Sequence, residues 1–170
     1  MKIKNLFLAM FAFVASTIAV NAQKTIVDVA VGSKDHTTLV AAVKAADLVS
    51  TLQSAGPFTV FAPTNAAFAK LPAGTLETLL KPENKATLTK ILTYHVIAGT
   101  FDAAAVVKAI QANGGSLSLT TVSGNKLVAS IKQGKVTLTD EKGNSSTVVA
   151  ADLTATNGVI HVIDAVVLPK

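Results

Sequence analysis

Cysteine, arginine and tryptophan are absent from this chain of 170 residues, and tyrosine occurs once. Without cysteine the protein can form no disulfide, has no thiol nucleophile and cannot be a lipoprotein with a lipidated cysteine. The absence leaves the redox compartment open, because a single domain of this size can bury enough apolar surface to fold without disulfides.

All fifteen basic residues are lysine, and the formal net charge is +5. Arginine supplies the planar fork that recognises phosphate and guanine, and aromatic rings supply the platforms on which bases stack. The lysines are scattered along the chain. We therefore expect no nucleic-acid partner, and we interpret the lysines as a solvated surface with a weak attraction to anionic cell-surface polymers.

The N-terminus has the three parts of a secretory signal peptide. Lys2 and Lys4 give a positive start, Leu6 to Ala15 are apolar, and Val20-Asn21-Ala22 offers a cleavage site before Gln23. The alternative is an uncleaved membrane anchor, which we disfavour because the apolar part is shorter than the roughly 20 residues of a membrane-spanning helix. We predict a signal peptide over residues 1–22, export to the periplasm or the extracellular space, and one domain over residues 23–170 with no integral membrane segment.

Helical patterns dominate the N-terminal half of the chain, where apolar residues recur at a spacing of three and four in alanine-rich segments. Asp102 can cap the last of these helices, and the glycines after Asn113 can end it. The predicted helices are His36 to Leu52, Thr75 to Leu80, a segment that starts at Pro82, and Ala103 to Ala112.

The C-terminal half of the chain switches to short segments in which apolar and polar residues alternate, separated by turns rich in glycine and asparagine. The predicted strands are Ser116 to Val122, Lys126 to Ile131, Lys135 to Thr139 and Thr147 to Ala151. Helices first and strands afterwards indicate an α+β fold.

The segment from Phe58 to Phe68 predicts a strand, a stop and a helix. Phe58 to Ala62 is apolar and suits a buried strand. Pro63 cannot donate to a sheet ladder, so the strand should stop there. Thr64 or Asn65 can then cap the following helix.

A second apolar segment lies near the C-terminus and opens with the turn signal Asn157-Gly158. Val159 to Leu168 is apolar on both faces, which predicts a buried central strand. Between the two segments, Tyr94-His95 precedes Val96-Ile97, and we expect this pair to enter a buried strand as well.

These three segments, in this order, closely resemble the first box, the Tyr-His motif and the second box of the fasciclin domain. The resemblance covers roughly Thr25 to Pro169. It implies a fasciclin-like α+β fold in which a helical N-terminal half packs on an antiparallel β-sandwich or wedge. It also implies a module for adhesion, because related animal proteins use the Tyr-His region in this way.

The usual constellations of enzymes and metal sites are missing. The chain has no Gly-x-Ser-x-Gly elbow, no phosphate loop and no dinucleotide fingerprint. His36, His95 and His161 are far apart and form no zinc-ligand pair. We expect no catalytic residue, no bound metal and no cofactor. Asn144-Ser145-Ser146 matches an acceptor for N-glycosylation, whose use depends on the host.

His161 and Asp164 are the pair that most invites a catalytic interpretation. Three residues apart on a continuous strand, they would point to opposite faces, so a direct dyad would need a bulge. The alternative is a buried histidine satisfied by the backbone and an aspartate bonded to a neighbouring turn. We favour this structural interpretation.

Tyr94 and His95 admit the same choice between an adhesion contact and a packed, hydrogen-bonded support. We again favour the structural interpretation and leave a second role in interaction open. The motif residues treated in this way are Thr64, Asn65, Tyr94, His95, His161 and Asp164.

Two functions follow. The leading hypothesis is a secreted or periplasmic module for adhesion, with a cell-surface or matrix protein or polysaccharide as its partner. The alternative is a carrier or sensor that holds a small apolar or anionic ligand in a pocket beside the sheet. A hydrolase that uses His161 is the least favoured interpretation.

Overall fold

The computed structural model describes residues 24–170, and the predicted signal peptide lies outside the described residues. Seven strands form one sheet in the order β2–β1–β7–β6–β5–β4–β3. Their bounds are β1 Phe58–Pro63, β2 Val96–Ala98, β3 Ser116–Thr120, β4 Lys126–Lys132, β5 Lys135–Thr139, β6 Ser145–Ala155 and β7 Gly158–Ile163. The pair β1–β7 is parallel and the other neighbours are antiparallel.

The helices of the described residues are short, and all of them precede β3. Their bounds are α1 Ile26–Val31, α2 Thr37–Ala45, α3 Val49–Gln53, α4 Asn65–Ala69, α5 Thr75–Leu79, α6 Lys85–Tyr94 and α7 Ala103–Ala112, with 3-10 turns at Lys34–His36 and Pro82–Asn84. Within the described residues, no helix is both long and apolar enough to cross a membrane.

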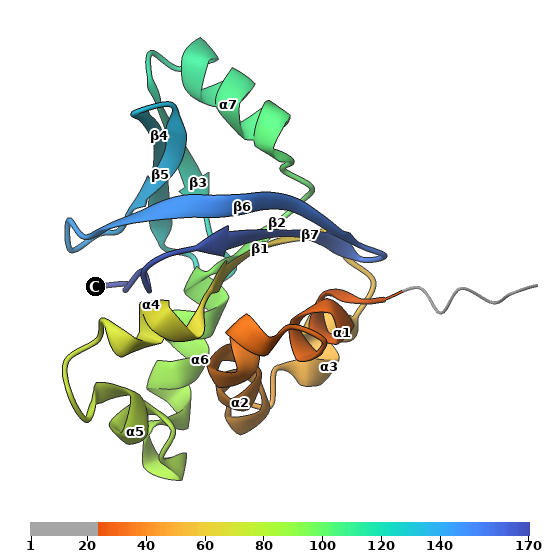
Figure 1. Cartoon of the computed structure of the whole chain (residues 1–170), viewed down its shortest axis with the longest axis vertical. Helices are drawn as coiled ribbons and strands as arrows, with labels where there is room; N and C mark the ends of the chain where they lie inside the picture. Colours follow the sequence, from red (N-terminus) through yellow and green to blue (C-terminus); the bar gives the residue numbers. More distant parts are fainter. Residues whose placement is uncertain (1–23) are drawn as a thin grey trace, which may run out of the picture.

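The sheet is curled into a wedge with helices outside it. Helices α1 to α6 gather on one side of β1, β6 and β7, whereas α7 lies beside β3, β4 and β5 on the other (Figure 1). The two edge strands meet at one point, because the Val122 N–H after β3 donates to the Val96 carbonyl of β2 at 2.8 Å. The fold is thus α+β, as the sequence predicts.

Strand β1 separates two apolar cores, because its side chains alternate between the two faces of the sheet. Val60 and Ala62 belong to the core under the helices, which we call the helix-side core. Phe61 belongs to the core inside the wedge, the wedge core, together with Tyr94 and Ile163. All of these side chains are buried.

The first box folds as predicted. Strand β1 ends at Pro63, and the Thr64 hydroxyl accepts from the Ala67 N–H at 3.2 Å at the start of α4. The helix capped by Asp102 is confirmed as α7, where the carboxylate accepts from the Ala105 N–H at 2.7 Å. The four predicted C-terminal strands are confirmed as β3 to β6, and β6 is longer at both ends than expected.

The longest predicted helix is wrong in extent. The helix expected from His36 to Leu52 is broken between α2 and α3, where Asp47 adopts a left-handed conformation with φ 55°. Aspartate is one of the few residues that tolerate this conformation. The short helix α1 before it was not predicted.

Tyr94 does not enter a strand, because it is the last residue of α6 and β2 begins at Val96. Likewise β7 stops at Ile163 and does not continue to Leu168. There the Asp164 N–H still donates to the Thr147 carbonyl at 3.1 Å, but the Val167 N–H turns to His95. The second box is therefore half strand and half irregular segment.

Candidate functional site

Thr64 and Asn65 have different structural roles at the start of α4. Thr64 is the N-cap, as described above. Asn65 joins α4 to the preceding helical segments: its Oδ1 accepts from the Thr38 N–H at 3.0 Å, and its Nδ2 donates to the Lys34 carbonyl at 3.0 Å. These contacts fix the helices on which the first box rests.

Tyr94 lies inside the wedge core with none of its surface exposed. Its hydroxyl donates to the carbonyl of Lys126 in β4 at 2.7 Å. Burial raises the pKa of Tyr94 to about 12, so the hydroxyl remains a donor at any physiological pH. The side chain therefore connects α6 to β4.

His95 is also buried and joins α6 to the C-terminal segment. Its Nδ1 lies 2.8 Å from the Ile91 carbonyl and its Nε2 lies 3.3 Å from the Val167 backbone nitrogen. Since a carbonyl can only accept, Nδ1 carries the proton and Nε2 accepts from Val167. Burial lowers the pKa of His95 to about 4, which keeps the ring neutral.

His161 lies on β7 and is held by two backbone groups. Its Nε2 donates to the Phe101 carbonyl at 2.6 Å, and its Nδ1 accepts from the Asp152 N–H at 3.4 Å. Its ring is stacked on Phe61, with 5.6 Å between the centroids. Asp152 sits in an irregular stretch of β6 with φ 59°, and this irregularity aims its N–H at the imidazole.

Asp164 is not a partner of His161. Its Oδ1 accepts from the Thr147 N–H at 2.8 Å, and its Oδ2 lies 4.0 Å from Lys70 Nζ. The carboxylate is thus bonded to strand β6 and not to a neighbouring turn. Both nitrogens of His161 are bonded to backbone, so the two residues form no dyad.

The structure does not bring the six motif residues together. Tyr94, His95 and His161 are buried, and Thr64, Asn65 and Asp164 are partly exposed. Among the described residues there is no group of three or more histidine, aspartate or glutamate side chains that could hold a metal ion. Asn144 is exposed, and its amide donates to Asp140 at 3.0 Å.

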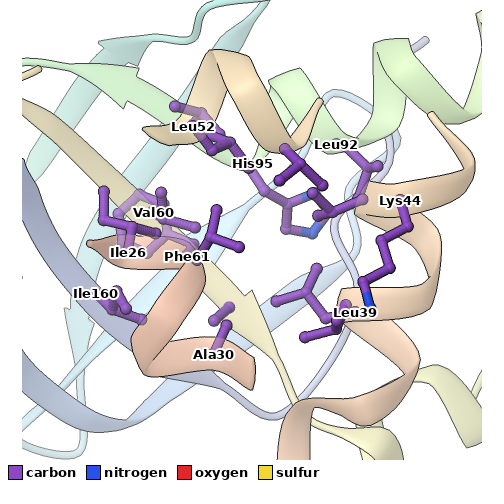
Figure 2. Close-up of a pocket in the computed structure, with 16 residues that line it drawn as sticks. Ile26, Ala30, Leu39, Lys44, Leu52, Val60, Phe61, Leu92, His95 and Ile160 are labelled. Atoms are coloured by element: carbon purple, nitrogen blue, oxygen red, sulfur yellow. The ribbon is translucent and has the colours of Figure 1, made fainter. Parts of the chain in front are cut away.

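An apolar cavity lies between α1, α2, α3 and β1, with His95 and Lys44 among its lining side chains (Figure 2). Its volume is about 40 Å³. A cavity of about 150 Å³ is needed to hold a ligand the size of benzene. In this conformation the cavity is therefore too small for an organic ligand, whatever its apolar lining suggests.

An open groove runs over β5 and β6 beside Asp164, and we call it the polar groove. Its volume is about 420 Å³. Thr137 and Thr147 are direct cross-strand partners in it, and Lys132 and Lys135 lie at the turn between β4 and β5. The lining residues are Lys132, Gln133, Lys135, Thr137, Ser145, Thr147, Val149 and Asp164.

Among the residues that line the polar groove, only Asp164 is a candidate site residue from the sequence. The alternation of Lys135 with Thr137 and of Ser145 with Thr147 places each pair on one face of its strand. The sequence does not give the β5–β6 register that sets the two pairs side by side, so the groove was missed.

The curled sheet, its helical layer and its two boxes define a fasciclin-type domain. The family model described as the Fasciclin domain matches residues 34–169. The chain belongs to this family.

Three similar proteins illustrate the range of the family. "Protein sll1483" of Synechocystis is 54% identical over 156 residues, which cover 92% of this chain and 79% of that protein. The pig transforming growth factor-beta-induced protein ig-h3 is 41% identical over 150 residues, which cover 85% of this chain and 19% of that protein. A FAS1 domain pair from the insect cell adhesion molecule Fasciclin I has a TM-score of 0.75 at 20% identity, over 85% of this chain and 51% of that chain, and supports the fold.

Proposed function

We propose that this protein is an exported adhesion module that binds an acidic polysaccharide of the cell envelope or extracellular matrix through the polar groove. The observation that carries the proposal is the pairing of lysines with hydroxyl and carboxylate groups in one open groove of a fasciclin domain. The predicted signal peptide supports export, and the insect relative described as a cell adhesion molecule supports adhesion.

The chemistry of the groove fits a polymer that carries both hydroxyl and carboxylate groups. Lys132 and Lys135 are exposed and can pair with the carboxylates of uronic acid units. Ser145 and Thr147 can exchange hydrogen bonds with sugar hydroxyls, and Asp164 can accept from them. Contacts of this kind at a solvated surface are individually weak, so a repeating polymer gains affinity from several contacts at once.

Catalysis is not part of the proposal. A general base must have a nitrogen or oxygen within reach of the substrate's proton. His161, the residue that most invites a catalytic role, has both ring nitrogens bonded to backbone groups. The hydrolase hypothesis therefore gains no support from the geometry.

Binding of residues 23–170 to immobilised polygalacturonate, with neutral dextran as the reference polymer, tests the proposal. We expect retention on the acidic polymer that weakens as salt screens the lysines. Lys132→Glu and Lys135→Glu should each reduce retention. Lys81→Glu, the same charge change between α5 and the following 3-10 turn, should not. Equal retention on dextran, or equal loss in all three variants, would contradict the polar groove as the binding surface.

A further inference from the structure

A second groove lies under α7, on the opposite face of β5 and β6 from the polar groove. We call it the α7 groove, and its volume is about 240 Å³. We propose that the α7 groove binds a small apolar monocarboxylate, which would give the protein a second ligand site that shares only Lys135 with the proposed adhesion surface. The walls are formed by Val106 and Val107 of α7 and by Val136, Val148 and Ala151 of the sheet.

The floor of the α7 groove presents an apolar surface, although one of its residues is a histidine. Phe61 and His161 line the floor as a stacked pair. Both nitrogens of His161 are engaged, with the Phe101 carbonyl and with the Asp152 N–H. The ring therefore offers carbon edges to the groove, and a ligand that lies on it needs an apolar body.

The rim carries a cation. Lys135, at the start of β5, is the charged residue among the described residues that line the α7 groove. Its exposed side chain also lines the polar groove, so the two grooves share this residue at the edge of the sheet. A lysine stem can lie along apolar surface while its ammonium stays in water, so the charge can reach a carboxylate at the mouth of the groove. Charge complementarity thus selects an anion, and the walls select an apolar tail.

The size of the groove agrees with a small organic ligand. Its volume exceeds the roughly 150 Å³ of a cavity that takes up benzene, which the cavity beneath α1 to α3 does not. Asp152 also ties the two walls together, because its Oδ1 accepts from the Ala103 N–H at the start of α7 at 2.8 Å. The groove is therefore formed before a ligand arrives and needs no opening of the core.

Titration of residues 23–170 with phenylpropionate, followed by amide and methyl chemical shifts, tests the proposal. We expect saturable shifts at Val107, Val136 and Ala151, and weaker binding of the neutral phenylpropanol. Lys135→Gln should weaken phenylpropionate binding about two- to fivefold, as loss of one exposed ion pair does. Lys132→Gln, the lysine across the same turn, should leave the affinity unchanged.

Filling the groove gives a second and independent test. Val107→Trp or Ala151→Leu should abolish binding in a variant that still unfolds cooperatively. Val149→Trp, which places the same bulk in the polar groove, should keep it. Absence of saturable shifts, shifts confined to the α1–α3 region, or equal affinity for acid and alcohol would overturn the proposal. Loss of polygalacturonate binding in Val149→Trp would not, since Val149 lines the polar groove and not the α7 groove. Lys135→Gln should weaken both kinds of binding, because Lys135 lines both grooves.

Discussion

At the scale of single residues, two buried histidines stabilise the fold in their neutral form, because burial disfavours their protonation. His95 is the clearest case, because both ring nitrogens are bonded inside the protein and burial lowers its pKa from 6.5 to about 4. Burial also lowers the pKa of His36. Protonation of either histidine therefore destabilises the folded state relative to the unfolded state.

We expect the free energy of unfolding to fall as the pH drops from about 6.5 to about 4. In that window His95 is protonated in the unfolded chain but remains neutral in the folded protein. Proton binding therefore stabilises the unfolded state. For His95 alone the loss amounts to about 3 kcal/mol at pH 4. Urea unfolding between pH 4 and 7.5 measures it. His95→Gln should unfold more easily at pH 7 and lose about 3 kcal/mol less on acidification, and an unchanged pH dependence would contradict this account.

Tyr94→Phe isolates the other half of the Tyr-His motif. The variant keeps the buried ring but leaves the Lys126 carbonyl without its 2.7 Å partner. We expect a loss of about 1–3 kcal/mol in the free energy of unfolding, measured in urea at pH 7. Binding to polygalacturonate should be unchanged, because Tyr94 does not line the polar groove. Parent-like unfolding with lost binding would instead place Tyr94 in an interaction site.

At the scale of elements, the parallel contact between β1 and β7 joins the two boxes. Phe58 is the register partner of Gly158. A Cβ on Gly158 would lie 1.9 Å from the Phe58 carbonyl oxygen, and one on Gly56 would lie 2.1 Å from the Asn157 carbonyl oxygen. The glycines are therefore required because two backbone segments approach closely there.

We expect Gly158→Ala to lower the free energy of unfolding by about 3 kcal/mol or more, since the strands must separate to admit the methyl group. Gly32→Ala is the matched control. Gly32 has φ −72° and 3.4 Å to the nearest atom, so alanine should be neutral or stabilising by up to about 1 kcal/mol. Thermal and urea unfolding of the two variants decide the matter, and equal effects would show that the approach of β1 and β7 is loose.

Local signals in the sequence predicted most of these elements, and long-range contacts decided the rest. Pro63, Thr64 and Asp102 act within a few residues, so β1 and the starts of α4 and α7 could be predicted. The end of β7 depends instead on a contact between Val167 and His95, 72 residues apart in the chain. The polar groove likewise needs the β5–β6 register, which no local pattern contains.

At the scale of the whole molecule, the N-terminal segment is part of the domain from its first described residues. The Thr156 N–H donates to the Lys24 carbonyl at 3.0 Å, and the Ile26 N–H donates to Asn157 Oδ1 at 3.0 Å. The amide of Asn157 also donates to the Leu52 carbonyl at 2.7 Å. Asn157, a turn signal in the sequence, thus holds α1 and α3 against the second box.

We propose that the signal peptide is cleaved before Gln23 and that the first helix of the remaining chain, α1, is needed for full stability of the domain. Intact mass of the exported protein should give an N-terminus at Gln23, and a leader retained in a membrane fraction would overturn this. Removal of residues 23–31 as well would delete α1 and expose the surface that Ile26 and Val27 cover. Burial of each side chain contributes about 1.5–3 kcal/mol, so residues 32–170 should be less stable than residues 23–170 by about 3–6 kcal/mol. Urea unfolding of the two proteins compares them directly, and equal midpoints would show that α1 is dispensable and that the domain begins after it.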